Sequence, residues 1–499
     1  MKKIISFIVC LTLIFSLAVP AFAVSEGSQK CPTIHVPGID SSTIYTDKDN
    51  PDQKVEIPGK EILVELIKEK ILPALVVYAA TRDIDKLGKT ITEVLNEGFK
   101  HWYNNPDGTA IGNAGVINNY PAASAIGENS KFRFSYDWRG DPIAIASELN
   151  DYINYITENS GFDKVALTSH SLGSIVVLSY ITIYGNDKIY GWVMDSPAMD
   201  GVSYVGDLLC GEINLTGESV LTFLKGTLGE NEYQDLISSS LDILEMSGVS
   251  DLAIDFFDDV IKKLAPVLYS ETLLPIFGHW LTIWAMIPEE RVEDAMDFFF
   301  EGYGKDKDLS VLRSKIEAYN NLVRKDRVST LLSFDESARV AVISRYGHTC
   351  FPVSVSWALA GDAVVETETS SLGAVTAPIG DYFSDEYLEG KDMKYISPDR
   401  TIDASTCLFP EKTWFIKEIL HEEVQYTSDY YPQLLFAEEE ATCDSFVLPR
   451  FTIFDRESHT IIVDESEPQK AKDPTPLERL FNFLKALFEK LVDFFTKKK

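Results

Sequence analysis

The chain has 499 residues, and its 77 acidic side chains against 45 basic ones give a formal net charge of −32. Because a nucleic-acid-binding surface needs clustered Lys and Arg, this balance argues against nucleic acid as a partner and is typical of an exported protein. The length exceeds one ordinary domain of roughly 150 residues, but a single large α/β core with an inserted cap also accounts for it.

The first 23 residues have the pattern of a secretory signal peptide. Lys2 and Lys3 precede an apolar run over residues 4–19, and residues 21–23 (Ala-Phe-Ala) form the small-x-small pattern of a signal-peptidase site. A retained membrane helix is the alternative, but the apolar run is at the short end for a span of about 20 residues. We therefore expect a secreted or cell-surface protein.

Short apolar segments rich in β-branched and aromatic residues predict strands. They cover residues 32–40, 132–138, 164–168, 190–194, 340–344 and 413–417. A helix is expected over residues 141–159, between the second and third of these strands. Strands that alternate with helices predict an α/β fold, in which a mostly parallel sheet is covered by helices on both faces.

Residues 216–334 lack strand signals and show helical periodicity, which predicts a helical cap inserted into the sheet domain. Helices are expected over residues 238–244, 252–264 and 291–300, with interruptions at residues 274–278 and 287–288. The sheet domain is then divided into residues 24–215 and 335–463. Within its first part, residues 80–130 are expected to be mostly loop with one helix.

The C-terminal part of the chain changes character twice. Residues 464–476 are polar and contain three prolines, which predicts a linker. Residues 477–499 repeat apolar side chains at i, i+3, i+4 and i+7 and end in three lysines, which predicts a strongly amphipathic helix. This helix either packs on its own domain or lies on a membrane or cell-envelope surface.

Metal and cofactor motifs are missing from the sequence. Five cysteines follow the predicted signal and include no C-x-x-C pair, so neither a disulfide framework nor a structural zinc site is expected, although one or two bridges stay open. His421-Glu422-Glu423 lacks the second His of an H-E-x-x-H site. We expect no metal and no cofactor.

The segment Ser169–Gly173, Ser-His-Ser-Leu-Gly, is similar to the G-x-S-x-G nucleophile elbow, in which a serine sits on a sharp strand-to-helix turn. The elbow needs small residues two before and two after the serine, and Ser169 and Gly173 are small. The main-chain N–H of Leu172 would then face a reacting carbonyl at a helix N-terminus. The pattern is loose, so Ser171 is either a nucleophile or a turn serine. His170 is expected to point away from it and pack beside the sheet.

A serine nucleophile needs a histidine base and a carboxylate that orients the histidine. In enzymes with this elbow the chain order is Ser, Asp, His. Asp362 stands in a Gly turn after the strand at 340–344, and only His421 and His459 follow it among the seven histidines. We favour His421, which comes directly after the strand at 413–417, over His459 in a polar turn. The alternative for Asp362 is a solvated turn residue.

Five motifs occur in a set order along the chain: residues 37–39 (Pro-Gly-Ile), 134–139 (Phe-Ser-Tyr-Asp-Trp-Arg), 169–173, 195–198 (Asp-Ser-Pro-Ala) and 361–362 (Gly-Asp). In this order they resemble the lecithin:cholesterol acyltransferase-like α/β-hydrolases over residues 32–425. The resemblance implies an α/β-hydrolase fold with Ser171 as nucleophile and Asp362 and His421 as its partners. It also implies an oxyanion hole from the main-chain N–H groups of Leu172 and Ile39. The sequence departs from the family at Ser169 and at residues 195–198, where the family tends to show Gly and Gly-Thr-Pro.

The resemblance implies ester chemistry on lipids, in which an acyl-enzyme passes its acyl group to water or to an alcohol. We expect a secreted ester hydrolase, with lipid O-acyl transfer as the alternative. The alternative of another class is a catalytically silent protein that binds a lipid or envelope component. Phe277, Trp280 and Trp284 either line an acyl pocket or are ordinary helix packing.

Overall fold

The computed structural model describes residues 30–54, 70, 72–117, 120–127, 129–213, 219, 263–352 and 354–468. The predicted signal peptide, the helix at 238–244, nearly all of the helix at 252–264, most of the linker and the C-terminal helix at 477–499 lie outside the described residues. Within the described ranges, no helix combines the length and the hydropathy that a membrane crossing requires.

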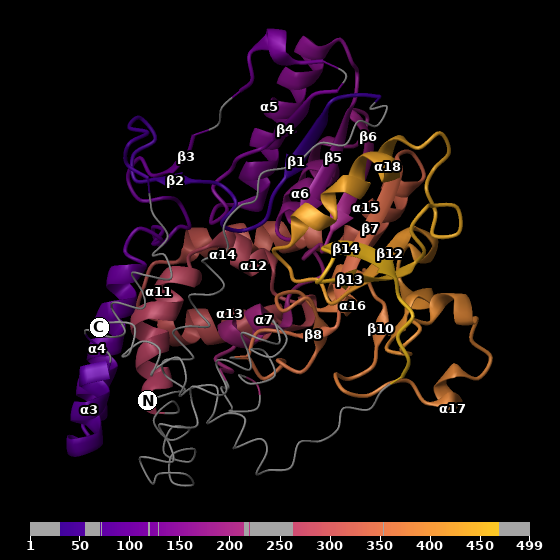
Figure 1. Ribbon diagram of the computed structural model, residues 1–499. Helices are drawn as coiled ribbons and strands as arrows, with labels where there is room; N and C mark the ends of the chain where they lie inside the picture. The colour runs from indigo at the N-terminus through magenta and orange to yellow at the C-terminus, as the bar shows by residue number, and fades with distance from the viewer. Residues whose placement is uncertain are drawn as a thin grey trace, which may run out of the picture.

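The centre of the molecule is an eight-stranded sheet in the order β14-β13-β12-β7-β6-β5-β1-β4 (Figure 1). Neighbouring strands run parallel, except that β13 and β14 pair antiparallel at one edge. In chain order the strands are β1 Thr33–Val36, β4 Lys131–Arg133, β5 Val165–His170, β6 Ile189–Asp195, β7 Arg339–Tyr346, β12 Thr413–Lys417, β13 Phe451–Asp455 and β14 Thr460–Val463. The predicted α/β class and mostly parallel sheet are confirmed.

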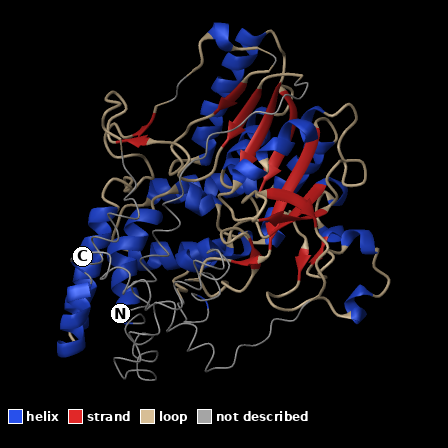
Figure 2. Cartoon of the chain, in the orientation of Figure 1, coloured by secondary structure: helices blue, strands red, loops and turns tan. Residues whose placement is uncertain are grey.

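Helices cover both faces of this sheet (Figure 2). In β5, Val165 and Leu167 belong to one buried cluster and Ala166 to another, and β6 and β7 alternate in the same way. On one face of the sheet, the first cluster includes buried side chains of α6 Gly173–Tyr184 and α15 Arg327–Asp335. On the other face, the second cluster includes those of α18 Tyr431–Phe436. Strands buried on both faces explain why the sequence shows continuous apolar runs there.

The helix predicted at 141–159 is α5 Pro142–Ser160, which packs against α6. Its ends follow from local chemistry. Asp141 caps the N-terminus by accepting a hydrogen bond from the main-chain N–H of Ile143 at 3.0 Å, Pro142 occupies the first turn, and Gly161 ends the helix at a φ of +75°.

The strand predicted at 132–138 is wrong in its extent, because only β4 Lys131–Arg133 pairs with the sheet. Phe134 still donates its main-chain N–H to the carbonyl of His35, but the following side chains turn to the loop after β1. The segment at 32–40, expected to be a short strand that ends in a Gly turn, forms β1 Thr33–Val36 and a turn at residues 39–40. Local β propensity does not report where a partner strand ends.

Between residues 80 and 130 the predicted helix is α4 Ile84–Gly98, which Asp83 caps by accepting from the N–H of Lys86 at 3.0 Å. It follows α3 Leu72–Thr81. The rest is loop with the short turn η2 Ala123–Ala125 and the small ribbon of β2 Ile44–Tyr45 with β3 Gly115–Val116.

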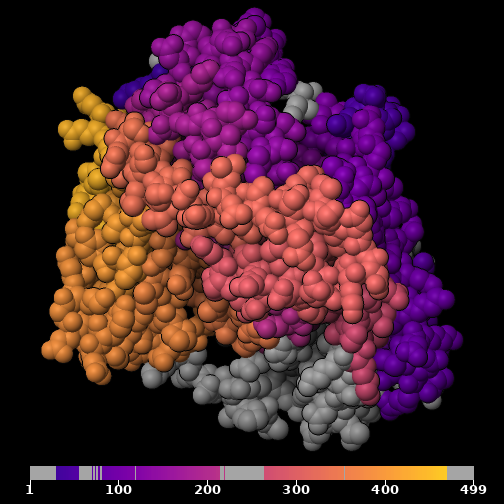
Figure 3. All heavy atoms as spheres, turned by 180° about the vertical axis from the view of Figure 1, so that it is seen from behind, coloured from indigo at the N-terminus to yellow at the C-terminus, as the bar shows by residue number. Residues whose placement is uncertain are grey.

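Residues 263–335, between β6 and β7 in the chain, form helices with no strand in that described stretch. They cover the middle of the face seen in Figure 3, in salmon. The helices before α15 are α11 Leu274–Phe277, α12 Leu281–Ala285, α13 Val292–Asp297 and α14 Ser310–Tyr319, with π-helical η3 Tyr269–Leu273, η5 Phe298–Tyr303 and η6 Asn320–Arg324, and the 3₁₀ turn η4 Glu289–Arg291. The helix predicted at 291–300 therefore corresponds to α13 and the start of η5.

The interruption predicted at 274–278 is confirmed only at its end, because η3 runs directly into α11 and the helix stops at Phe277, with Gly278 as its C-cap. A π-helical turn widens the helix just before Pro275, which has no N–H to donate and whose ring would otherwise meet the preceding turn. The break at 287–288 is confirmed, since α12 ends at Ala285 and Pro288 precedes η4.

The remaining elements lie in the connections after β6, β7 and β12. They are α7 Ser203–Leu209, β8 His348–Thr349, β9 Ala360–Gly361, α16 Thr367–Ser370, β10 Val375–Thr376, α17 Asp385–Leu388, η7 Met393–Tyr395, β11 Ile402–Asp403, η8 Ala404–Thr406, η9 Pro410–Lys412, η10 Val424–Tyr426 and η11 Ser428–Tyr430. Ser171 and His421 lie in turns after β5 and β12 of the sheet, and Asp362 lies in the turn after β9, in the connection that follows β7.

Candidate active site

Ser171 occupies a sharp turn between β5 and α6. Its φ is +53°, a left-handed conformation that non-glycine residues rarely adopt. Its main-chain N–H donates to the carbonyl of Asp195 at 3.2 Å, and its own carbonyl accepts from the N–H of Ser174 at 3.0 Å. Backbone strain of this kind is the local feature that a nucleophile elbow requires.

The two small residues around Ser171 have different roles. A Cβ on Gly173 would lie 2.0 Å from the carbonyl oxygen of Val36, so that only glycine fits beside the end of β1. Ser169 stands where the elbow usually has Gly. Its hydroxyl accepts a hydrogen bond from the indole N–H of Trp192 at 2.8 Å, which satisfies the extra polar atom inside the sheet.

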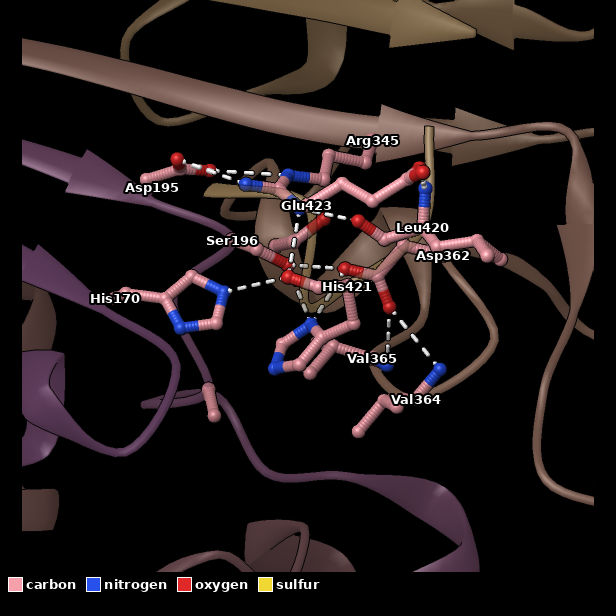
Figure 4. Close-up of polar contacts among 12 residues, drawn as sticks. His170, Asp195, Ser196, Arg345, Asp362, Val364, Val365, Leu420, His421 and Glu423 are labelled. Carbon is pink, nitrogen blue, oxygen red and sulfur yellow. Dashed lines mark hydrogen bonds and ion pairs between the residues drawn. The ribbon is translucent and has the colours of Figure 1, made fainter. Parts of the chain in front are cut away.

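Asp362 is fully buried in the turn after β9, not solvated (Figure 4). One carboxylate oxygen, Oδ1, accepts from the main-chain N–H groups of Val364 at 3.1 Å and Val365 at 2.7 Å. The other, Oδ2, accepts from Nδ1 of His421 at 2.7 Å. Burial alone would raise the pKa of Asp362, but His421, Arg345 and the hydrogen bonds outweigh it and lower the pKa to about 2.

His421 lies in the turn after β12, and its main-chain N–H donates to the carbonyl of Asp362 at 3.0 Å. Because Nδ1 donates to the Asp362 carboxylate, Nε2 is the nitrogen left to accept a proton. No hydrogen bond joins the imidazole to the Ser171 hydroxyl in the described part of the chain; such bonds are often long until substrate is bound. The residues Ser171 and His421 are 7% and 8% exposed, so both are buried.

Ser196 is a site residue that sequence reasoning missed. It follows β6, with a φ of +46°, and its hydroxyl donates to Oδ2 of Asp362 at 2.5 Å and lies 3.3 Å from Nδ1 of His421. It therefore contacts both Asp362 and His421. The sequence singled out residues 195–198 only as a departure from a family pattern, although a polar residue directly after a central parallel strand was an available signal.

The main-chain N–H groups of Leu172 and Ile39 have no hydrogen-bond partner among the described residues. Leu172 precedes α6, and Ile39 follows Gly38, on which a Cβ would lie 2.9 Å from the Cβ of Ser171. These two donors, from the residue after Ser171 and the residue after Gly38, are therefore available to a negatively charged substrate oxygen.

The run 134–139 fixes the loop that carries Ile39. The phenol of Tyr136 donates to the carbonyl of Pro37 at 2.5 Å, and the indole of Trp138 donates to the carbonyl of Ser42 at 3.2 Å. Arg139 forms its ion pair with Asp137, at 2.7 Å, and is fully buried. These residues brace the loop and do not contact Ser171 through any of these bonds.

The other predicted candidates lie elsewhere. His459 lies in the turn between β13 and β14, where its ring packs near those of Tyr426 and Phe454, at 5.9 Å and 6.3 Å between centroids. His421, not His459, is thus the histidine that contacts Asp362.

Phe277, Trp280 and Trp284 are buried in aromatic packing. The indole N–H of Trp280 donates to the carbonyl of Trp102 and that of Trp284 to the carbonyl of Gly278, each at 2.9 Å. The rings of Phe277 and Trp280 pack edge to face, 4.9 Å apart. These contacts are those expected for helix packing, the alternative to an acyl pocket.

The described residues contain no group of three or more His, Cys, Asp or Glu side chains placed to hold a metal ion. Cys210, Cys350, Cys407 and Cys443 are free thiols.

No protein-family model and no curated protein matches the chain. Among solved structures, a chain in "The crystal structure of Tle4-Tli4 complex" is similar to part of it, with 13% sequence identity over 48% of this chain and 71% of that chain. The TM-score is 0.21, which is too low to support a conclusion about fold family or function. The candidate site is therefore interpreted from its own geometry.

Proposed function

We propose that the chain is a serine hydrolase that cleaves carboxylic esters, with lipids as the substrate class, and that its fold is an α/β-hydrolase with a helical cap between β6 and β7. The observation that carries the proposal is the left-handed turn at Ser171, with the buried Asp362–His421 pair in turns at the same side of the sheet. The chain order Ser, Asp, His supports it. The lipid substrate and the acyltransferase-like family rest on the sequence resemblance alone.

In the proposed reaction, Nε2 of His421 takes the hydroxyl proton of Ser171 as Oγ attacks the ester carbonyl. The negative charge that develops on the carbonyl oxygen accepts hydrogen bonds from the N–H groups of Leu172 and Ile39. The imidazolium, which Asp362 stabilises, then gives its proton to the departing alcohol, leaving an acyl group on Ser171. A water molecule, activated in the same way, releases the acid.

The proposed cellular setting comes from the sequence. Residues 1–23 predict export, and residues 477–499 predict an amphipathic helix that either lies on a membrane or envelope surface or packs on its own domain. Co-sedimentation with vesicles, with and without residues 477–499, tests the second point.

The experiment that tests the function measures hydrolysis of p-nitrophenyl butyrate and p-nitrophenyl palmitate. Ser171→Ala and His421→Ala should each lower kcat by about 10³-fold or more. His459→Ala is the matched control and should keep the activity of the unmodified protein. Undiminished turnover in Ser171→Ala, or no turnover by folded unmodified protein on either ester, would refute the proposal.

A further inference from the structure

The main-chain carbonyl of His421 accepts two hydrogen bonds from side chains of two different strands. Nε2 of His170, the last residue of β5, donates at 2.9 Å. Nη1 of Arg345, in β7, donates at 2.7 Å and also reaches the carbonyl of Leu420 at 2.5 Å. Figure 4 shows His170 to the left of His421 and Arg345 above it. The backbone that carries the imidazole is thus held directly, in addition to the contact between Nδ1 and Asp362.

Arg345 is itself held by Asp195, and neither side chain of this ion pair is exposed. Its Nε donates to Oδ1 at 3.1 Å and its Nη2 to Oδ2 at 2.9 Å, so that the guanidinium contacts both oxygens. The hydroxyls of Thr427 and Tyr431 also donate to Oδ2, each at 2.5 Å. Both residues follow His421 in the chain. The chain that follows His421 is therefore tied directly to the end of β6, in addition to the contact that runs through Arg345.

Stability alone does not account for this arrangement. Burying two opposite charges is costly, and apolar residues of similar volume often stabilise a fold equally well. A buried ion pair does, however, fix directions, because a planar guanidinium has its N–H groups at set angles. In this molecule, Nη1 of Arg345, which makes no hydrogen bond to Asp195, donates to the carbonyls of Leu420 and His421, and Nη2 also donates to the hydroxyl of Thr427 at 3.3 Å.

His170 occupies the space between the His421 turn and the loop after β1. Its ring centroid is 4.4 Å from that of His421, and a Cβ on Gly38 would lie 3.4 Å from its Nδ1. Burial, followed by the neighbouring His421 and Arg345, holds the pKa of His170 well below 6.5. The ring is therefore neutral and carries its proton on the nitrogen that donates to the carbonyl.

We propose that His170, Arg345 and Asp195, which we call the carbonyl clamp, are positioning residues. They hold the imidazole of His421 where it can take the hydroxyl proton of Ser171. The inference rests on the proposed function, because it assigns the clamp a task in proton transfer. The contact with Asp362 sets the tautomer of the His421 ring, whereas the carbonyl clamp sets the position of the His421 main chain. A misplacement of about 1 Å in such a site costs roughly 10²-fold in rate.

The first test compares two substitutions of His170. His170→Phe keeps a ring of similar size but removes the N–H, and it should lower kcat for p-nitrophenyl butyrate by about tenfold with KM within about twofold, because binding is untouched. His170→Gln places an amide N–H near the former Nε2 and should recover most of the loss. A side chain that only fills space would give the opposite order, with Phe tolerated better than Gln.

The second test replaces the guanidinium. Arg345→Lys keeps the charge but cannot contact Asp195 and two carbonyls together, so kcat should again fall about tenfold. Arg450→Lys is the matched control. Arg450 is also buried, contacts Glu411 at 2.9 Å and donates to the carbonyls of Lys394 and Pro410. It directly precedes β13, at the opposite end of that strand from the turns that carry Ser171 and His421, so the activity should not change.

The outcomes separate the clamp from the function on which it rests. Suppose that the unmodified protein turns over the ester and that folded His170→Phe has a kcat within twofold of it. This result refutes the positioning role of the carbonyl clamp but not the proposed ester hydrolase activity. Unmodified protein without turnover overturns both. If Arg345→Lys fails to fold by circular dichroism, the two His170 variants decide the matter alone.

Discussion

Gly173→Ala is the substitution whose effect the geometry defines most closely. The new Cβ would lie 2.0 Å from the carbonyl oxygen of Val36 and 2.8 Å from that of Pro37. Ordinary van der Waals contact begins at 3.4 Å, so the Val36 carbonyl and the start of α6 would have to separate by about 1.4 Å. Both atoms belong to the backbone, and no side-chain rotation can relieve the contact. The displaced segment carries Ile39, one of the two proposed oxyanion donors.

We expect Gly173→Ala to lower kcat/KM for p-nitrophenyl butyrate by about 10²-fold or more, since a shift of about 1 Å at a reacting centre costs that much. Overpacking should also lower the free energy of unfolding by about 1–3 kcal/mol, measured by urea denaturation. Gly302→Ala is the control, because nothing lies within 4 Å of its Cβ position. A folded Gly173→Ala protein with the unmodified turnover would refute the elbow assigned to Ser171.

Two further substitutions test the surroundings of Asp362. Ser196→Ala removes the hydroxyl that donates a hydrogen bond to the Asp362 carboxylate. A hydrogen bond to a charged acceptor contributes about 1.5–3 kcal/mol, so kcat should fall about tenfold or more. Ser354→Ala, the control, removes a similar hydrogen bond to Asp207 and should not alter turnover. Glu366 is buried, which raises its pKa from 4.5 to about 7. Because the folded state holds this proton more tightly, its contribution to stability is present below pH 4.5 and is lost as the pH rises through about 7. Glu366→Gln should therefore gain up to about 3 kcal/mol of unfolding free energy relative to the unmodified protein between pH 4.5 and 7.5, and a difference that stays constant with pH would contradict the assignment.

The parts of the site that the sequence predicts are those set by local pattern and chain order. The apolar strand before Ser171, the glycine at 173 and the helix after it specify the elbow within one short segment. Asp362 and His421 could be placed by the chain order Ser, Asp, His, because Asp362 stands in a Gly turn downstream of the predicted strand at 340–344 and His421 comes shortly after the predicted strand at 413–417.

Contacts that depend on the order of β5, β6, β7 and β12 in the sheet could not be predicted from the sequence. Ser196 and Arg345 reach the site only because β6 lies next to β7 and β7 next to β12, which strand propensity does not encode. The same limit explains β4, whose length depends on its pairing with β1. The helix at Pro275 was missed for a local reason, because a π-helical turn accommodates a residue without an N–H. His170 was expected to pack beside the sheet, but its ring also donates to His421, far along the chain.

The central claim is that Ser171 is an activated nucleophile, and covalent labelling tests it most directly. The full chain is incubated with a fluorophosphonate, digested and analysed by mass spectrometry. We expect one adduct, on the Oγ of Ser171, which is absent in Ser171→Ala and forms far more slowly in Asp362→Asn. An adduct on a different residue, or none on folded protein, would contradict the account.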